Sequence, residues 1–319
     1  MTETAAQYVI DVPPKPPHLP TADELVERAI WPDMPAEIYH AIPAMSAGGL
    51  KRMRSSPAHF FGMQLDPDRP PPGEPSAAMK NGTLVHCCIF EPGQVRERYV
   101  VMPENAPKRP TAVQRNAKKP SPETADAIAW WDEFEAKHKG AEVIDLAQMA
   151  AALRQAANLR ALPEIGQLLS KGQGEASVFW RDPITGELCK CRPDWLSPAG
   201  ADGLIVLDGK TTADASPAGF ARTCWNMDYP LQAAWYADGI AAALGKTVHG
   251  FVFGVVESAW PHPAAAYMLD DEVMAWARRE NRRLLDTYAE CKKAGRWPAY
   301  DQNIQLIAMP AWAMKEIAQ

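Results

Sequence analysis

The stretch LIVLDGK, residues 204–210, decides the fold class of this chain. Its first four residues are all apolar, as expected of a strand that is buried on both faces of a sheet. Alternate side chains of a strand share a face, so Asp208 and Lys210 should point the same way, with Gly209 between them. A buried carboxylate needs a compensating charge. The sequence leaves two sources open, the Lys210 ammonium alone or a divalent cation shared with another carboxylate.

The segments around this strand predict an α/β fold. Residues 176–180, 188–195, 249–256 and 265–269 read as further strands, and the turn compositions at 182–186 and 197–200 join the first two to residues 204–207 as a meander. Helices are expected at 46–54, 124–137, 146–153, 217–227, 229–244 and 270–294. The apolar stripe of the third continues to Ala157, and Pro163 should interrupt or restart this helix. Residues 82–90 are either a buried helix or a buried strand. We therefore expect a central mixed sheet flanked by helices.

The first 36 residues have a different composition. They are rich in proline and show little apolar periodicity, which favours a flexible, extended N-terminal arm over residues 1–36. The remaining residues, 37–319, are expected to form one domain. Within it, the Pro- and Lys-rich residues 103–122 predict a long loop.

Composition and charge exclude several classes of protein. The chain has 319 residues and a formal net charge of −6, so it lacks the overall basic character of many nucleic-acid binders. Basic clusters at 51–54, 108–119 and 278–283 are either solvated faces or local contacts to a phosphate backbone. None of the six cysteines forms a CxxC pair, which argues against a zinc ribbon or a four-cysteine iron–sulfur cluster. The sequence shows no long apolar run and no secretory signal, which predicts a cytoplasmic protein without a membrane partner.

Acidic and basic side chains recur at the ends of the predicted strands. Glu175 opens the first strand, Asp194 lies near the end of the second, and Asp208 and Lys210 close the third. Taken alone, each is compatible with a structural role, an Asp208–Lys210 ion pair and a turn capped by Asp194. Gln232 and Tyr236 stand four residues apart on a predicted helix and would share one face.

The order of these residues along the chain is a more specific signal than any one of them alone. The motifs RPD at 192–194, DGK at 208–210 and QAAWY at 232–236 resemble those of the PD-(D/E)XK nuclease superfamily. The match is closest to the RecE-type exonuclease (exonuclease VIII) family, which is related to lambda exonuclease and to the RecB nuclease domain. Residues 46–57 look like the entry segment of these nucleases, and residues 82–86 look like the helix that supplies their metal-binding histidine. The resemblance spans residues 38–295, and Asp208 stands where many members have glutamate.

The resemblance implies a role for each residue. His86, Asp194, Asp208 and the Gly209 carbonyl would bind Mg2+ or Mn2+, and Lys210 would orient or activate the attacking water. Gln232 and Tyr236 would contact the substrate, or they pack the helix. Arg192 lies in the same predicted strand as Asp194, and it either contacts a phosphate of the substrate or is a surface charge. Glu175 would be a catalytic carboxylate that supports the metal ligands or binds a second metal.

The resemblance also implies a function. It points to a 5′ to 3′ exonuclease that acts on double-stranded DNA ends and leaves 3′ single-strand tails for phage-type homologous recombination. Its partners would be a RecT-like single-strand annealing protein and further copies of itself in a homo-oligomeric ring. Two alternatives stay open, an endonuclease or single-strand-directed nuclease with the same site, and a catalytically silent DNA-binding scaffold.

Overall fold

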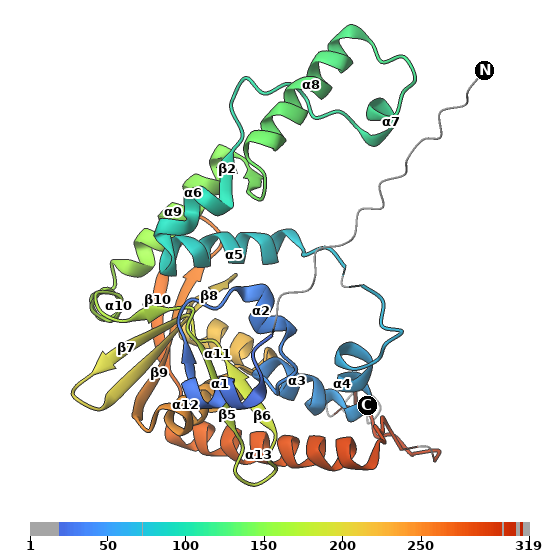
Figure 1. The fold of residues 1–319 in the computed structure, drawn as a ribbon. Helices are drawn as coiled ribbons and strands as arrows, with labels where there is room; N and C mark the ends of the chain where they lie inside the picture. Colours follow the sequence, from blue (N-terminus) through green and yellow to red (C-terminus); the bar gives the residue numbers. More distant parts are fainter. Residues whose placement is uncertain (1–18, 72, 302, 311–312, 315–319) are drawn as a thin grey trace.

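The computed structural model describes residues 19–71, 73–301, 303–310 and 313–314. Helices flank a central mixed sheet (Figure 1), which confirms the predicted fold class. Among the described residues, no helix is both long enough and apolar enough to cross a membrane.

The central sheet has five strands, and β8 (Gly203–Thr212) lies in its middle. The order is β10-β9-β8-β7-β4, where β8 and β9 (Thr247–Glu257) run parallel and the other neighbours are antiparallel. The apolar run at 204–207 is therefore covered on both faces, as predicted. The outer strands are β10 (Ala264–Met268), β7 (Trp195–Ala199) and β4 (Gln173–Gly174).

Alternation along β8 divides the core into two parts. Leu207 packs with α5 (Ala77–Phe90), α9 (Leu146–Arg160) and the neighbouring α10 (Pro163–Leu169), whereas Val206 packs on the opposite face with α12 (Tyr229–Leu244). Residues 82–90 are thus helical, which answers the question that the sequence left open. The Ser76 hydroxyl caps α5 by accepting a hydrogen bond from the Met79 N–H.

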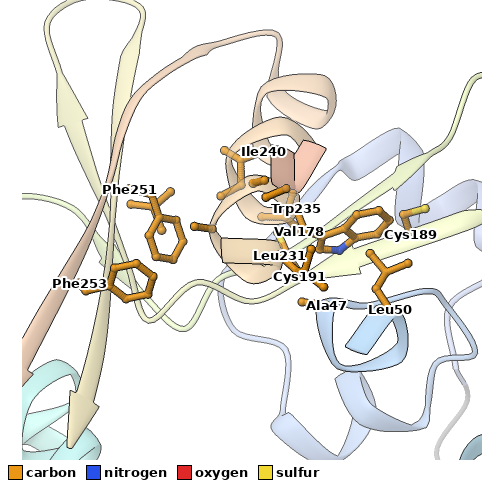
Figure 2. Close-up of a cluster of buried hydrophobic side chains, with 14 of the residues drawn as sticks. Ala47, Leu50, Val178, Cys189, Cys191, Leu231, Trp235, Ile240, Phe251 and Phe253 are labelled. Atoms are coloured by element: carbon orange, nitrogen blue, oxygen red, sulfur yellow. The ribbon is translucent and has the colours of Figure 1, made fainter. Parts of the chain in front are cut away.

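A second, three-stranded sheet packs on the other side of α12. It contains β1 (Ile30–Trp31), β5 (Ser177–Arg181) and β6 (Leu188–Cys191). Figure 2 shows Trp235 and Ile240 of α12 between the phenylalanines of β9 and the side chains of β5 and β6. The Trp235 indole N–H donates to the Lys190 carbonyl at 3.1 Å. Helix α12 therefore fixes the two sheets relative to each other.

The predicted strand at 188–195 is wrong in one respect. It is two strands, because β6 ends at Cys191 and β7 begins at Trp195 in the other sheet. Pro193 lies at the break, where its missing N–H and fixed φ do not favour a continuing ladder. No single meander forms, because β5 pairs with β6 while β7 pairs with β8. This break leaves Asp194 at the end of the five-stranded sheet.

The predicted N-terminal arm is also wrong over residues 19–36. Helix α1 (Ala22–Arg28) begins at a capping box in which Thr21 and Glu24 satisfy each other's backbone N–H groups. Leu25 is 1% exposed, and β1 pairs with β5. This local capping and the burial of Leu25 outweigh the proline content. Residues 1–18 of the predicted arm lie outside the described residues.

The other predicted helices are confirmed, with small differences at their ends. Ser46 caps α3 by accepting from the Gly49 N–H at 3.2 Å. Helices α7 and α8 project from the body of the molecule (Figure 1), and α7 lies within the predicted loop at 103–122. The remaining elements are α2 (Ala36–Ala41), α3 (Ala47–Ser55), α4 (Pro57–Gln64), η1 (Pro92–Gln94), α6 (Val95–Arg98), β2 (Tyr99–Val101), α7 (Ala112–Arg115), α8 (Pro122–Lys137), β3 (Glu142–Ile144), α11 (Pro217–Asn226) and α13 (Asp271–Ala294).

Candidate active site

The candidate site lies where β7 stops pairing with β8. The ladder between these strands ends at the pair Trp195–Leu207, one residue before Asp208. Beyond this point, the Gly209 N–H donates to the Asp194 carboxylate at 2.7 Å, so a side chain takes the place of a strand partner. The break between β6 and β7 thus brings Asp194 to the open edge of β8.

Asp208 and Lys210 share the α12 face of β8, as the alternation predicts. Asp208 is fully buried, and its Oδ1 accepts from the Gln232 amide at 2.6 Å. Its Oδ2 forms an ion pair with the Lys210 ammonium, so the pair expected from a purely structural role is present. Burial nevertheless raises the pKa of Asp208 to about 6, with the Asp194 charge adding to the effect. Lys210 therefore compensates the charge of Asp208 only in part.

Gly209 lets helix α5 approach the strand. A Cβ at this position would lie 2.6 Å from the Phe90 ring, closer than any real contact permits. His86 precedes Phe90 by one helical turn, and their rings lie 4.7 Å apart. The absence of a side chain at Gly209 therefore brings His86 within reach of the carboxylates. Its Nε2 lies 2.7 Å from Asp194 Oδ2, and its Nδ1 lies 3.3 Å from Glu175 Oε1.

Glu175 is held in the cluster by its backbone and by Arg192. Its φ of 53° is uncommon for a residue other than glycine, and such strained positions concentrate at functional sites. Arg192 Nε donates to Glu175 Oε2 at 2.7 Å, and the same guanidinium donates to the Met34 carbonyl and the Ser177 hydroxyl. The guanidinium is thus engaged with protein groups, and a contact between Arg192 and substrate stays a prediction. In this structure Arg192 orients Glu175.

The electrostatics of the cluster favour a positive charge among its carboxylates. Burial opposes protonation of His86, but the charges of Asp194 and Glu175 outweigh it and raise the pKa of the imidazole to about 9. Burial likewise disfavours the charge of Asp194, yet His86 holds the pKa of that carboxyl below its usual value. The pKa of Glu175 is raised, mainly by burial. A proton on the imidazole thus compensates two crowded carboxylates.

A divalent ion fits these residues. One ligand atom each from His86, Glu175 and Asp194 lies within 4.8 Å of the other two. Carboxylate oxygens with one imidazole suit Mg2+ or Mn2+, and an ion there would take over the role of the imidazole proton. Glu175 replaces Asp208 in this trio, which differs from the predicted ligand set. The Gly209 N–H contacts Asp194, and the ligand role of the Gly209 carbonyl stays a prediction.

The two residues of the predicted helix motif, Gln232 and Tyr236, have different contacts. Gln232, in the first turn of α12, contacts Asp208. Tyr236 lies one turn farther along the helix and packs its ring against Phe251 at a centroid distance of 6.1 Å. Within the described part of the chain, Gln232 is therefore the member of this pair that contacts a carboxylate, and Tyr236 supports the core.

Sequence reasoning missed Tyr229 and the placement of Lys51. The Lys210 and Lys51 ammonium groups lie 4.8 and 5.1 Å from the Tyr229 ring centroid. Burial lowers the pKa of Lys51 to about 8, and the neighbouring Lys210 contributes. A cleft of about 390 Å³ opens beside the site and is lined by His86, Gly209, Lys210, Thr211, Tyr229 and part of α5. The basic cluster at 51–54 was the sequence signal for Lys51, and Tyr229 had none.

The other two basic clusters are largely ion-paired. Arg109 and Arg115 pair with Glu135 and Asp132 of α8, which leaves the exposed Lys108, Lys118 and Lys119 as the cationic groups of that segment. On α13, three arginines pair with Asp238, Asp182 and Glu280. Most of these residues therefore belong to solvated faces on which the charges are paired.

Comparison with solved structures supports the fold. A candidate exonuclease from Eubacterium rectale matches with a TM-score of 0.53 and 13% identity, covering 90% of this chain and 98% of that chain. The protein SSO0001 matches 49% of this chain and 69% of its own at 15% identity, and its TM-score of 0.26 carries no weight. Comparison with curated proteins finds no match.

The family comparison covers most of the chain. The model of the PDDEXK-like domain of unknown function (DUF3799) matches residues 46–310, which include every residue of the candidate site. The predicted superfamily is therefore confirmed, while the RecE-type assignment stays a prediction. On this match, the chain belongs to the DUF3799 family of PDDEXK-like domains.

Proposed function

We propose that this chain is a metal-dependent nuclease that hydrolyses phosphodiester bonds in DNA. The observation that carries the proposal is the cluster of His86, Glu175 and Asp194 around one point, with Asp208 and Lys210 alongside on β8. The motifs at 192–194 and 208–210 resemble the carboxylates and lysine of the PD-(D/E)XK superfamily, and the family match spans all five residues.

Each residue of the cluster has a separate role in the proposed reaction. His86, Glu175 and Asp194 would hold the ion, and Asp208 would complete the site from the opposite face of β8. A bound Mg2+ or Mn2+ polarises a phosphodiester and lowers the pKa of a coordinated water. Lys210 supplies a fixed positive charge where negative charge develops on the phosphate. Gln232 holds Asp208 in place, and Arg192 does the same for Glu175.

Within the nuclease class, we propose a double-strand exonuclease that acts 5′ to 3′. This narrower assignment rests on the likeness of the motifs to RecE-type enzymes, as do recombination, a RecT-like annealing partner and a homo-oligomeric ring. The same likeness supports a single nuclease domain from residue 37 onward. The Eubacterium rectale protein, described as a candidate exonuclease, is consistent with this choice through its fold.

The test uses linear duplex DNA that is labelled separately at each 5′ and each 3′ end, beside a covalently closed circle. With Mg2+, we expect early release of the 5′ label, late release of the 3′ label and an intact circle. EDTA and the variant Asp208→Asn should both stop degradation. Cutting of the circle would reassign the site to an endonuclease. DNA that is bound but left intact with Mg2+ would favour the silent scaffold.

A further inference from the structure

Near the site, the exposed Trp225 packs against the partly buried Trp276. Trp225 of α11 and Trp276 of α13 have ring centroids 5.0 Å apart, and the Arg54 guanidinium of α3 lies 5.8 and 5.5 Å from them. Trp225 is 53% exposed and the neighbouring Met227 is 54% exposed. Exposed apolar side chains that cluster are typical of interaction surfaces. We call Trp225, Trp276 and Arg54 the aromatic platform.

The platform is rigid. Arg54 forms ion pairs with Asp228 and, at 3.9 Å, with Glu280, so the guanidinium is fixed between α12 and α13. Asp228 has a φ of 54°, in the left-handed region, and its N–H donates to the Trp225 carbonyl at 3.2 Å. These contacts lock the link between α11 and α12. The backbone that carries Trp225 is therefore held in place, and its ring packs against Trp276.

The platform is continuous with the candidate active site. Asp228 of the link precedes Tyr229, whose ring carries the Lys210 ammonium. On α3, Lys51 and Arg54 are three residues apart and share one face, so Lys51 contacts Tyr229 while Arg54 contacts the tryptophans. One row of cations and aromatic rings thus runs from the catalytic lysine to the surface.

Cations border the platform, and the carboxylates Asp214, Asp228 and Glu280 lie among them in ion pairs. Arg222 and Arg279 are exposed and lie three residues from Trp225 and Trp276 on their helices, which places each one turn away from a ring. The Glu280 carboxylate is shared between Arg54 and Arg283. Exposed aromatic rings among cations are the features with which proteins bind unpaired nucleotides, the bases stacking and the phosphates pairing with the cations.

We propose that the aromatic platform stacks an unpaired base of the DNA strand whose phosphate lies at the candidate active site. The inference deepens the proposed nuclease function and rests on it. The ligand is a single-stranded stretch of at least a few nucleotides, such as the frayed end of a duplex, with Lys51 and Arg54 along its phosphates. A base held by Trp225 separates the strand from its complement next to the cleavage site.

The test measures binding without cleavage. In EDTA, an oligothymidine strand and an abasic strand of the same length are titrated against the full chain at one salt concentration. Because the two strands carry the same phosphates, their difference reports base stacking. We expect the wild type to bind oligothymidine about tenfold more tightly, with quenching of tryptophan fluorescence. Trp225→Ala should remove most of this preference, and Trp225→Phe should retain part of it.

A matched control is available elsewhere in the chain. Trp260, in the β9–β10 turn, is 74% exposed and has the Arg154 guanidinium 5.8 Å from its ring. Trp260→Ala should leave the preference for bases unchanged. Equal affinity of the wild type for both strands would overturn the inference, and so would a full preference in Trp225→Ala. A Trp225→Ala variant that loses self-association in sedimentation velocity and keeps the base preference would make the surface a contact between copies.

Failure of this inference and failure of the proposed function are distinguishable. If DNA is degraded with Mg2+ but bases add no affinity, the nuclease function stands and the aromatic platform has no part in it. If bases add affinity through Trp225 but no degradation occurs, the platform binds DNA and the proposed reaction is wrong.

Discussion

Two buried aspartates, Asp182 and Asp208, are held in opposite ways. Asp182, in the turn between β5 and β6, accepts from the Thr185 N–H at 2.8 Å, the Thr185 hydroxyl at 2.7 Å and Arg282 at 2.7 Å. Burial disfavours its charge, but these partners outweigh burial and hold the pKa of Asp182 below its usual value. Asp208 accepts a hydrogen bond from Gln232 and forms an ion pair with Lys210, yet its pKa is raised to about 6.

We interpret this difference as the difference between a structural carboxylate, Asp182, and a functional one, Asp208. Asp182 is satisfied by the protein itself, so its turn is complete without a ligand. Asp208 faces a second carboxylate, Asp194, and the pair lies beside a cleft. A buried charge that the fold leaves only partly compensated indicates that the fold is built for an additional cation.

The largest expected effect follows from removing the partly compensated charge. Asp208→Asn and Lys210→Met should each lower the rate of Mg2+-dependent DNA hydrolysis by at least about 10²-fold, because each removes a charge that the proposed function assigns to the reacting site. Circular dichroism should show an unchanged fold. If both variants fail to fold, the Asp208–Lys210 pair is structural, and Asp208 does not differ from Asp182 in the way described above.

The satisfied aspartate should behave in the opposite manner. Asp182→Ala leaves Arg282 and Thr185 without their partner, and we expect it to lower the free energy of unfolding by about 1–3 kcal/mol. The rate of DNA hydrolysis should stay near that of the wild type at a temperature where the variant is folded. Urea unfolding and the end-label assay measure the two quantities. Loss of hydrolysis in a folded Asp182→Ala variant would show that the two regions are coupled.

The two aspartates should also respond differently to pH in the metal-free protein. The raised pKa of Asp208 gives stability that is present below its ordinary value of 3.8 and is lost as the pH rises through about 6. Asp208→Asn should therefore gain stability relative to the wild type between pH 4 and pH 6. The lowered pKa of Asp182 gives stability that is present above 3.8 and is lost at lower pH.

Urea unfolding in EDTA across this pH range checks both signs. The cost of Asp182→Ala should be constant from pH 5 to pH 8 and shrink below pH 4. A flat difference between Asp208→Asn and the wild type from pH 4 to pH 7 would mean that the Asp208 carboxyl is compensated as fully as that of Asp182.

Local signals in the sequence predicted much of the fold. The apolar run before Asp208 identified the central strand, and Ser46 identified the start of α3. The capping box at Thr21 and Glu24 is equally local, and the proline content nearby masked it. The strand break at Pro193 depends on which sheet each half joins, a long-range pairing that strand propensity does not contain.

The candidate site also contains residues that the sequence pointed to and contacts that it did not. The resemblance of the motifs to PD-(D/E)XK nucleases pointed to Asp194, Asp208, Lys210 and Gln232, and strand alternation predicted that Asp208 and Lys210 share one face. The position of Glu175 in the trio, the role of Arg192 as its support and the contact between Lys51 and Tyr229 depend on elements far apart in the chain. Such contacts exist only once α3, α5 and α12 pack together.

The central claim is that His86, Glu175 and Asp194 form a divalent cation site, and calorimetric titration of the metal-free protein with Mn2+ tests it most directly. Because the pKa of His86 is about 9, binding near pH 7.5 should release a proton, which two buffers of different ionisation enthalpy reveal. We expect Mn2+ binding with proton release in the wild type and in Asp182→Ala, and much weaker binding in Asp194→Asn. No binding, or equal binding in Asp194→Asn, would contradict the account.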